Sequence, residues 1–222
     1  MTKHLLQDLD RLSQDLLRIS GKVEDAIADA IESLLTRNDE TARKVIDRDR
    51  EIDQEEIEVE EKALKILALH QPVARDLRFV VSAVKINNDL ERMGDHAVNI
   101  AKRARELAHL PAVVPPEGIE EMTGKVRSMV HQAIEALVHR DPGSARKVPL
   151  ADDAVDDANH AIIRSVTREI VKAASEDRDR IEPLMKWITV SRNLERVADL
   201  ACNIAEDVIY LVEAEIVRHP QA

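Results

Sequence analysis

Two stretches of this sequence place acidic side chains four residues apart, in a pattern that could bind a metal ion. The first stretch contains Glu91 and Asp95, and the second contains Glu195 and Asp199. Residues four apart lie on one face of an α-helix, so each stretch would present two carboxylates side by side. Paired carboxylates can hold a cation or exchange a proton, and either use requires a helix that fixes their positions.

The two stretches are copies of one another. Their identical residues recur at one constant separation along the chain: Glu91, Arg92, Asp95, Asn99, Ile100 and Ala101 reappear as Glu195, Arg196, Asp199, Asn203, Ile204 and Ala205. An apolar series accompanies the acids in each copy and predicts a packing face beside them. The repeat therefore predicts two equivalent acidic sites.

A second pair of acids precedes each stretch, at Asp49 and Asp53 in the first half and at Asp152 and Asp156 in the second. Asp49 and Asp152 occupy positions where the helical period requires an apolar side chain. Two helices packed on this face would bring four carboxylates together, and each like-charge pair costs about 2–3 kcal/mol at ~6 Å and an effective dielectric constant of ~20. The acids must therefore separate into solvent, take up protons, pair with neighbouring arginines or bind cations.

The repetition of both pairs favours a metal site over a solvated face, although a single Glu-x-x-x-Asp motif is usually only a solvated face. Ligands that are all oxygen suit Mg²⁺, Mn²⁺ and iron, whereas zinc more often recruits His or Cys. His96 directly follows Asp95 and points in another direction, so we expect it at the surface or at an interface. Cys202, the single cysteine, excludes an internal disulfide, and we expect it to be a buried structural thiol.

Catalytic motifs are missing from the sequence. It contains no Gly-rich phosphate loop, no His-Glu-x-x-His motif and no nucleophile elbow, and the acids lack the Glu-x-x-His pairs of di-iron bundles. We therefore expect a protein that is not an enzyme. A carboxylate-bridged metalloenzyme and a purely structural helical module remain as alternatives.

The composition predicts long helices to position these acids. The chain of 222 residues has only five glycines and eight prolines, and 44% of it is hydrophobic with about 1% aromatic residues. The apolar periodicity predicts helices from Leu5 to about Arg37, from Asn38 or Asp39 to about His70, and from Pro72 to about His109. Short connections between long helices make antiparallel neighbours, so the first half is predicted to be a three-helix bundle.

The second half repeats this plan after a linker at residues 111–118 that contains three prolines and a glycine. The Ala-Arg-Lys-Val sequence at 42–45 recurs at 145–148, turns are expected at 141–143 and 174–179, and Pro183 falls in the first turn of the last helix. We therefore predict an all-α fold of two tandem antiparallel three-helix bundles, at residues 1–110 and 119–222.

The charge balance limits the possible partners and location. The formal net charge is −11, with no dense cluster of Lys and Arg, which disfavours direct binding to nucleic acid. The sequence has no run of ~18 apolar residues, and its first residues lack the uninterrupted apolar core that is expected of a signal peptide. A cytoplasmic location is therefore expected.

The chain resembles the PhoU family of bacterial phosphate-signalling regulators over almost its full length. The resemblance rests on the segment His-Gln-Pro-Val-Ala-Arg-Asp-Leu-Arg at 70–78, on Glu-Arg-Met-Gly-Asp-His at 91–96, and on the copy of the latter at 195–200. In that family such acids hold metal ions or multinuclear clusters, of iron or zinc. The resemblance thus implies metal ligands at Asp49, Asp53, Glu91, Asp95, Asp152, Asp156, Glu195 and Asp199. Asn99 and Asn203, on the same stripes, would add ligands or support them.

The resemblance also implies a function that no local motif reveals. Proteins of this family are not catalysts. They help to hold the phosphate-starvation response off when phosphate is plentiful, as adaptors between the ATPase of the Pst phosphate transporter and the PhoR sensor kinase. They are cytoplasmic, meet the membrane only through these partners, and are commonly homodimers. Iron or zinc, with manganese or magnesium as alternatives, would be their metals.

Overall fold

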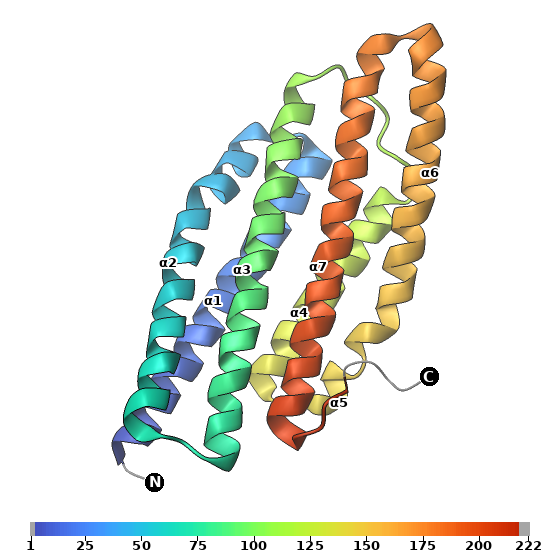
Figure 1. The fold of residues 1–222 in the computed structure, drawn as a ribbon. Coiled ribbons are helices and arrows are strands. Elements are labelled where there is room, and N and C mark those ends of the chain that lie inside the picture. The colour runs from blue at the N-terminus through green and yellow to red at the C-terminus, as the bar shows by residue number, and fades with distance from the viewer. Residues whose placement is uncertain (1–2, 218–222) are drawn as a thin grey trace.

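Long helices make up the computed structural model, which describes residues 3–217 and has no strand among them. The long helices are α1 (Lys3–Thr36), α2 (Asp39–His70), α3 (Ala74–His109), α4 (Ile119–His139), α6 (Asp152–Glu176) and α7 (Ile181–Glu213). A short helix, α5 (Pro142–Ala145), and two 3₁₀ segments, η1 (Val148–Ala151) and η2 (Arg178–Arg180), complete the described elements. The predicted all-α fold with six long helices is confirmed (Figure 1).

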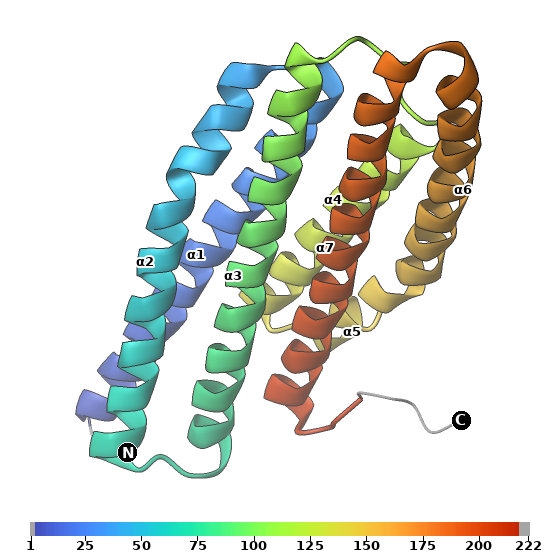
Figure 2. The same cartoon turned by 45° about the horizontal axis from the view of Figure 1, so that its top comes forward.

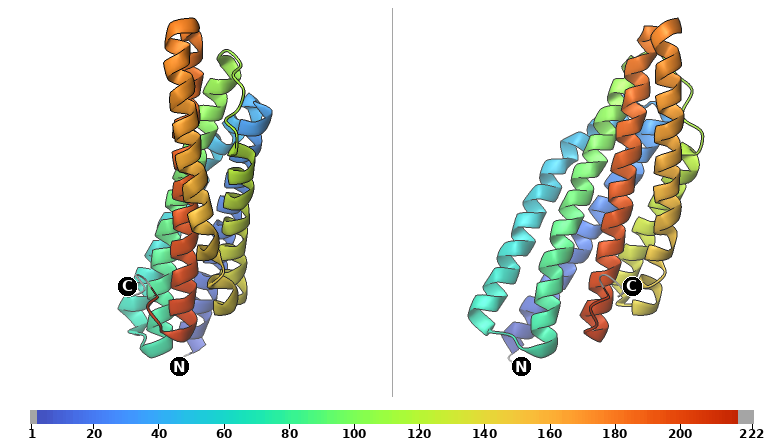
Figure 3. Two further views of the ribbon diagram at one scale, coloured as in Figure 1. Left: turned by 90° about the vertical axis from the view of Figure 1, so that its right-hand side faces the viewer. Right: turned by 45° about the vertical axis from the view of Figure 1, so that its right-hand side comes forward.

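The six long helices form two groups of three that lie side by side. Helices α1, α2 and α3 pack together, as do α4, α6 and α7, and α3 lies against α7 between the two groups (Figures 1 and 2). Successive helices within a group run in opposite directions, and so do α3 and α7 (Figure 3). One continuous apolar core extends through both groups. The predicted antiparallel bundles are therefore present and share one core.

Helices α3 and α7 are central because each buries more than one face. Adjacent residues are buried along α7, as at Leu200 with Ala201 and at Ile204 with Ala205. Neighbours in sequence lie about 100° apart around a helix, so a buried stripe this wide must contact partners on two sides. Helix α1 also buries adjacent residues, such as Ala30 with Ile31, and it packs against α2, α3 and α4.

Polar caps and left-handed residues fix several helix ends. The Asn38 side chain accepts hydrogen bonds from the backbone N–H groups of Glu40 (3.0 Å) and Thr41 (3.1 Å), which confirms the predicted cap of α2. Gln71 adopts the left-handed conformation after α2. The placement of Pro72 in the first turn of α3 was wrong, because α3 begins at Ala74 and Pro72 lies in the connection. A proline disfavours the right-handed helical conformation in the residue before it, which agrees with the left-handed Gln71.

The two halves differ where the sequence repeat suggested that they match. Residues 42–45 lie inside α2, whereas the same four letters at 145–148 cross from α5 through a turn into η1. Pro149 explains the difference, because it lacks a backbone N–H and its ring clashes with the preceding turn of an α-helix. Helix α6, which corresponds to α2 in the repeat, therefore begins only at Asp152. Pro183 lies in the first turn of α7, as predicted.

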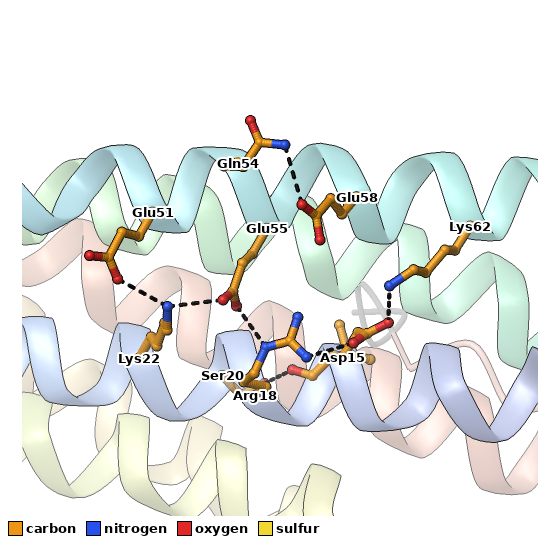
Figure 4. A network of polar contacts seen from close by, with 10 residues as sticks. Asp15, Arg18, Ser20, Lys22, Glu51, Gln54, Glu55, Glu58 and Lys62 are labelled. Carbon is orange, nitrogen blue, oxygen red and sulfur yellow. Dashed lines mark hydrogen bonds and ion pairs between the residues drawn. The ribbon is translucent and has the colours of Figure 1, made fainter.

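Ion pairs join α1 to α2 on the side shown in Figure 4. Asp15 accepts hydrogen bonds from Arg18 at 2.7 Å and from Lys62 of α2, and its side chain is only 11% exposed (Figure 4). Burial alone would raise the pKa of Asp15, but the hydrogen bonds from Lys62 and Arg18 outweigh it and hold the pKa below its usual value. The carboxylate therefore stabilises the fold in its ionised form.

The substitution Asp15→Asn is expected to lower the free energy of unfolding at pH 7 by about 1–3 kcal/mol, since it weakens two charge-assisted hydrogen bonds. The stabilisation is present above the ordinary pKa of an aspartate and is lost as pH falls through the lowered pKa of the folded state. Urea unfolding at pH 7 and near pH 3, with the exposed Asp10→Asn as control, measures the effect. An equal loss of stability at both pH values would contradict this role for Asp15.

Candidate metal centre

The four acids of the first half lie at the contact between α2 and α3. Asp49 and Glu91 are half-buried, whereas Asp53 and Asp95 are exposed. Burial raises the pKa of Asp49, and the charges of Asp53 and Asp95 raise it further. Burial also raises the pKa of Glu91, with added contributions from Asp95 and Asp53. The structure thus places all four predicted residues close enough together for their charges to influence the pKa values of Asp49 and Glu91.

Gly94 allows α2 and α3 to approach closely beside these acids. A Cβ atom at this position would lie 3.5 Å from Ile52 Cγ2 and 4.0 Å from an oxygen of Asp49. The glycine therefore places the half-buried Asp49 directly against the backbone of the helix that contains Glu91 and Asp95.

The four acids of the second half lie at the equivalent contact between α6 and α7. Burial raises the pKa of Asp152, and the charges of Asp156 and Asp199 raise it further. The pKa of Glu195 is also raised, chiefly by burial, although the nearby Arg196 opposes the shift. One carboxylate oxygen of Asp152 and one of Asp156 are buried without a hydrogen-bond partner. A buried oxygen without a partner is costly, so this site is chemically suited to a cation.

The arginine next to the acids forms different ion pairs in the two sites. Arg92 forms an ion pair with Asp89 (3.3 Å) outside the first site, whereas Arg196 forms ion pairs with Asp199 (3.0 Å) and Glu195 (3.5 Å) inside the second. The first site therefore keeps more uncompensated negative charge.

The side chains are gathered but do not form a ligand sphere. Within residues 3–217, no three His, Cys, Asp or Glu side chains converge closely enough to hold one ion. Carboxylates on adjacent helix turns can change rotamer without moving the backbone. The helices therefore fix where the acids lie, and rotamer changes of the side chains would be needed to coordinate an ion. Metal binding by the eight acids stays a prediction.

Cys202 belongs to the second site, which sequence reasoning did not foresee. Its thiol forms a hydrogen bond with the side chain of Asp152, and burial together with the charges of Asp152 and Asp199 raises the pKa of the thiol. The sequence spacing could have predicted this position, because Cys202 follows Asp199 by three residues and so shares its helix face. The residue at the matching position of the first half is Val98, which is buried.

The remaining candidates lie on α3 and α7. His96 Nδ1 lies 2.9 Å from Asn193 Oδ1 of α7, which confirms the expected interface histidine. Asn99 is exposed, and Asn203 lines a groove together with residues of α2 and α3. Their role as additional ligands or supports stays a prediction.

Comparison with known proteins decides the family. The family model described as "PhoU domain" matches this chain twice, at residues 16–104 and 119–208. The chain belongs to the PhoU family. The two PhoU matches fall on the two helical bundles, so the internal repeat is a repeat of this domain.

Named relatives and solved structures agree with this assignment. The PhoU chain is 39% identical to the phosphate-specific transport system accessory protein PhoU homolog of Aquifex aeolicus, over 97% of this chain and 96% of that protein. It is 35% identical to the protein of the same name from Clostridium acetobutylicum, over 96% of each. The crystal structure of PhoU from Pseudomonas aeruginosa superposes with a TM-score of 0.83 at 34% identity, covering 94% of this chain and 99% of that one.

None of the described helices is long and apolar enough to span a lipid bilayer.

Proposed function

We propose that this PhoU protein is an accessory regulator of a phosphate-specific transport system. The observation that supports it most directly is the full-length similarity to relatives that are named as accessory proteins of such systems. The protein would act in the cytoplasm as a homodimeric adaptor between the transporter's ATPase subunit and a phosphate sensor kinase. It would repress the starvation response when phosphate is plentiful, and it would reach the membrane only through these partners.

Metal binding at the two acidic sites is the second part of the proposal. Asp49, Asp53, Glu91 and Asp95 would hold ions in the first half, and Asp152, Asp156, Glu195 and Asp199 would hold them in the second. Two observations support it: burial and mutual repulsion raise the pKa values of acids in both sites, and the second site has buried oxygens without partners. Bound iron or zinc would supply positive charge and tie α2 to α3 and α6 to α7.

The metalloenzyme alternative is less well supported than the regulator. The relatives' names describe an accessory role, and none of these names describes a catalytic activity. Regulation through docking requires only a stable surface, which two bundles with a shared core provide.

Deletion of the gene is expected to release a phosphate-starvation reporter, such as alkaline phosphatase, in cells grown with abundant phosphate. Activity should rise at least about tenfold, because an adaptor that holds the response off leaves it on when removed. Reporter assays in the deleted strain, with and without the wild-type gene restored, measure the effect. Tight repression in the deleted strain would contradict the proposed direction of regulation.

The metal part is tested in the same strain by restoring the protein with all eight acids changed to Asn or Gln. If that protein folds and represses fully, the adaptor function is retained and the metal part of the proposal fails. Circular dichroism of the purified variant establishes that it is folded, so the two parts can be judged separately.

A further inference from the structure

A basic pocket lies at the end of the molecule where α3 begins and where α4 and α7 end. Its volume is about 350 Å³ and its lining residues are Arg75, Arg78, Phe79, Arg140, Leu211 and Val212. Among residues 3–217 no acidic side chain lines it, although acids outnumber bases 43 to 32 in this chain. The pocket is distant from the acidic sites, because Arg78 and Glu91 are separated by about 20 Å along α3 at ~1.5 Å per residue.

The three arginines of the pocket have no carboxylate partners among the described residues. Arg78 Nε donates a hydrogen bond to the carbonyl oxygen of Leu211 at 3.0 Å, and so satisfies the C-terminal end of α7. Arg140 lies with its guanidinium carbon 5.3 Å from the centre of the Phe79 ring. Within the described residues its side chain forms one hydrogen bond, to Ser13, which is long at 3.4 Å. Arg75 is exposed, and its side chain forms no hydrogen bond or ion pair within residues 3–217.

Two of the acids near the pocket already form ion pairs with an arginine outside it. Glu213 and Glu215, just beyond the pocket-lining end of α7, form ion pairs with Arg146. The hydrogen bond from Arg146 is the main reason that the pKa of Glu213 is lowered. Asp76 follows Arg75 in sequence but does not line the pocket. The positive charge of the three pocket arginines is therefore left for a ligand.

We propose that this pocket binds a small free anion that contains phosphate groups, of about the size of pyrophosphate. The planar guanidinium group donates two parallel hydrogen bonds to phosphate oxygens, which suits arginine to this ligand better than lysine. The volume corresponds to about twelve water molecules at ~30 Å³ each, so it accommodates more than one phosphate group. Stacking on Phe79 restricts the orientation of Arg140, and the bond to Leu211 restricts Arg78, so both are partly ordered before the anion arrives.

The test is calorimetric titration of the full-length protein with inorganic pyrophosphate, after metal has been removed with a chelator and the chelator dialysed away. Removing metal prevents the anion from binding through cations at the acidic sites. Orthophosphate, sulfate and succinate are titrated in separate experiments, at low and at physiological salt. The expected result is one pyrophosphate per chain, with affinity that falls as the ionic strength rises.

The variant Arg75→Gln with Arg140→Gln is expected to weaken pyrophosphate binding at least about tenfold, because it removes two charged donors while Arg78 continues to cap α7. Arg127→Gln with Arg164→Gln is the matched control, since both residues are exposed, their side chains lack polar partners among the described residues, and the change in net charge is equal. That control should bind like the wild type.

Three results would overturn the proposal. They are no measurable binding of pyrophosphate, an equal loss in the control variant, and tighter binding of succinate than of pyrophosphate. The last result would indicate a docking site for carboxylates of a partner protein. None of them would affect the proposed role in regulating phosphate transport, which the reporter experiment tests independently.

Discussion

Replacing both Asp49 and Asp152 by Asn is expected to raise the melting temperature of chelator-treated protein and to abolish the further rise that metal gives the wild type. Each substitution removes a half-buried charge that is repelled by neighbouring acids. A gain of about 1 kcal/mol per site is expected, and for a protein of this size 1 kcal/mol corresponds to about 2–4 °C. An ion present at about 100 times its dissociation constant stabilises the wild type by about 2.7 kcal/mol per site.

The pH dependence of the metal-free protein provides a second measure of the same substitution. The folded state raises the pKa values of Asp49 and Asp152, so it binds protons more strongly than the unfolded chain does. Stability should therefore fall as pH rises from the ordinary pKa of an aspartate through the raised value, and the penalty is complete above it. The double variant lacks this dependence at the two positions, so its advantage over the wild type should disappear at low pH.

Scanning calorimetry with chelator and with added zinc or iron measures both effects, and elemental mass spectrometry of gently purified protein gives the metal content. Asp47→Asn with Asp157→Asn is the matched control, because these exposed residues lie on the same helices and change the charge equally. The metal hypothesis fails if the wild type contains no metal and gains no stability from it. The acids are then a solvated face.

A fragment of residues 113–222 is expected to show no cooperative unfolding transition of its own. Helix α7 is buried on two sides, and one of them is provided by α3, which the fragment lacks. Its first long helix, α4, has 21 residues, whereas α1 has 34. Without α3 the fragment would expose apolar residues of α7 to water, at a cost of about 25 cal/mol for each Å².

Circular dichroism melts of the fragment, of residues 1–112 and of the whole chain test this dependence. The whole chain should unfold in one transition, and mixing the two fragments should restore ordered structure to the second. A cooperative melt of the isolated 113–222 fragment at the temperature of the whole chain would show that the bundles are independent. Residues 1–112 serve as the control, since their three helices contain most of the contacts that α1 and α2 make.

The sequence repeat was sufficient to predict the helices and to group the eight acids, because apolar periodicity and constant spacing can both be recognised without knowledge of tertiary structure. It was insufficient where one residue changes the backbone, as Pro149 does between α5 and α6. It also could not reveal the shared core. The sequence pattern predicts which faces of α3 and α7 are buried, but it does not identify the helix that covers each face. The arginine pocket was missed for the same reason, because Arg140 is distant in sequence from Arg75 and Arg78.

The antiparallel contact between α3 and α7 has a consequence for the origin of the chain. These helices are equivalent in the repeat, as are α1 and α4, which also touch. Equivalent elements that contact one another are the mark of a two-fold symmetric pair, so an ancestral gene encoding one bundle could have produced a self-complementary dimer before duplication fused its copies. After fusion the sequences of the two copies can change independently. His96 now reaches Asn193, while Leu200 and Asp89 stand at the mirrored positions and differ from that pair.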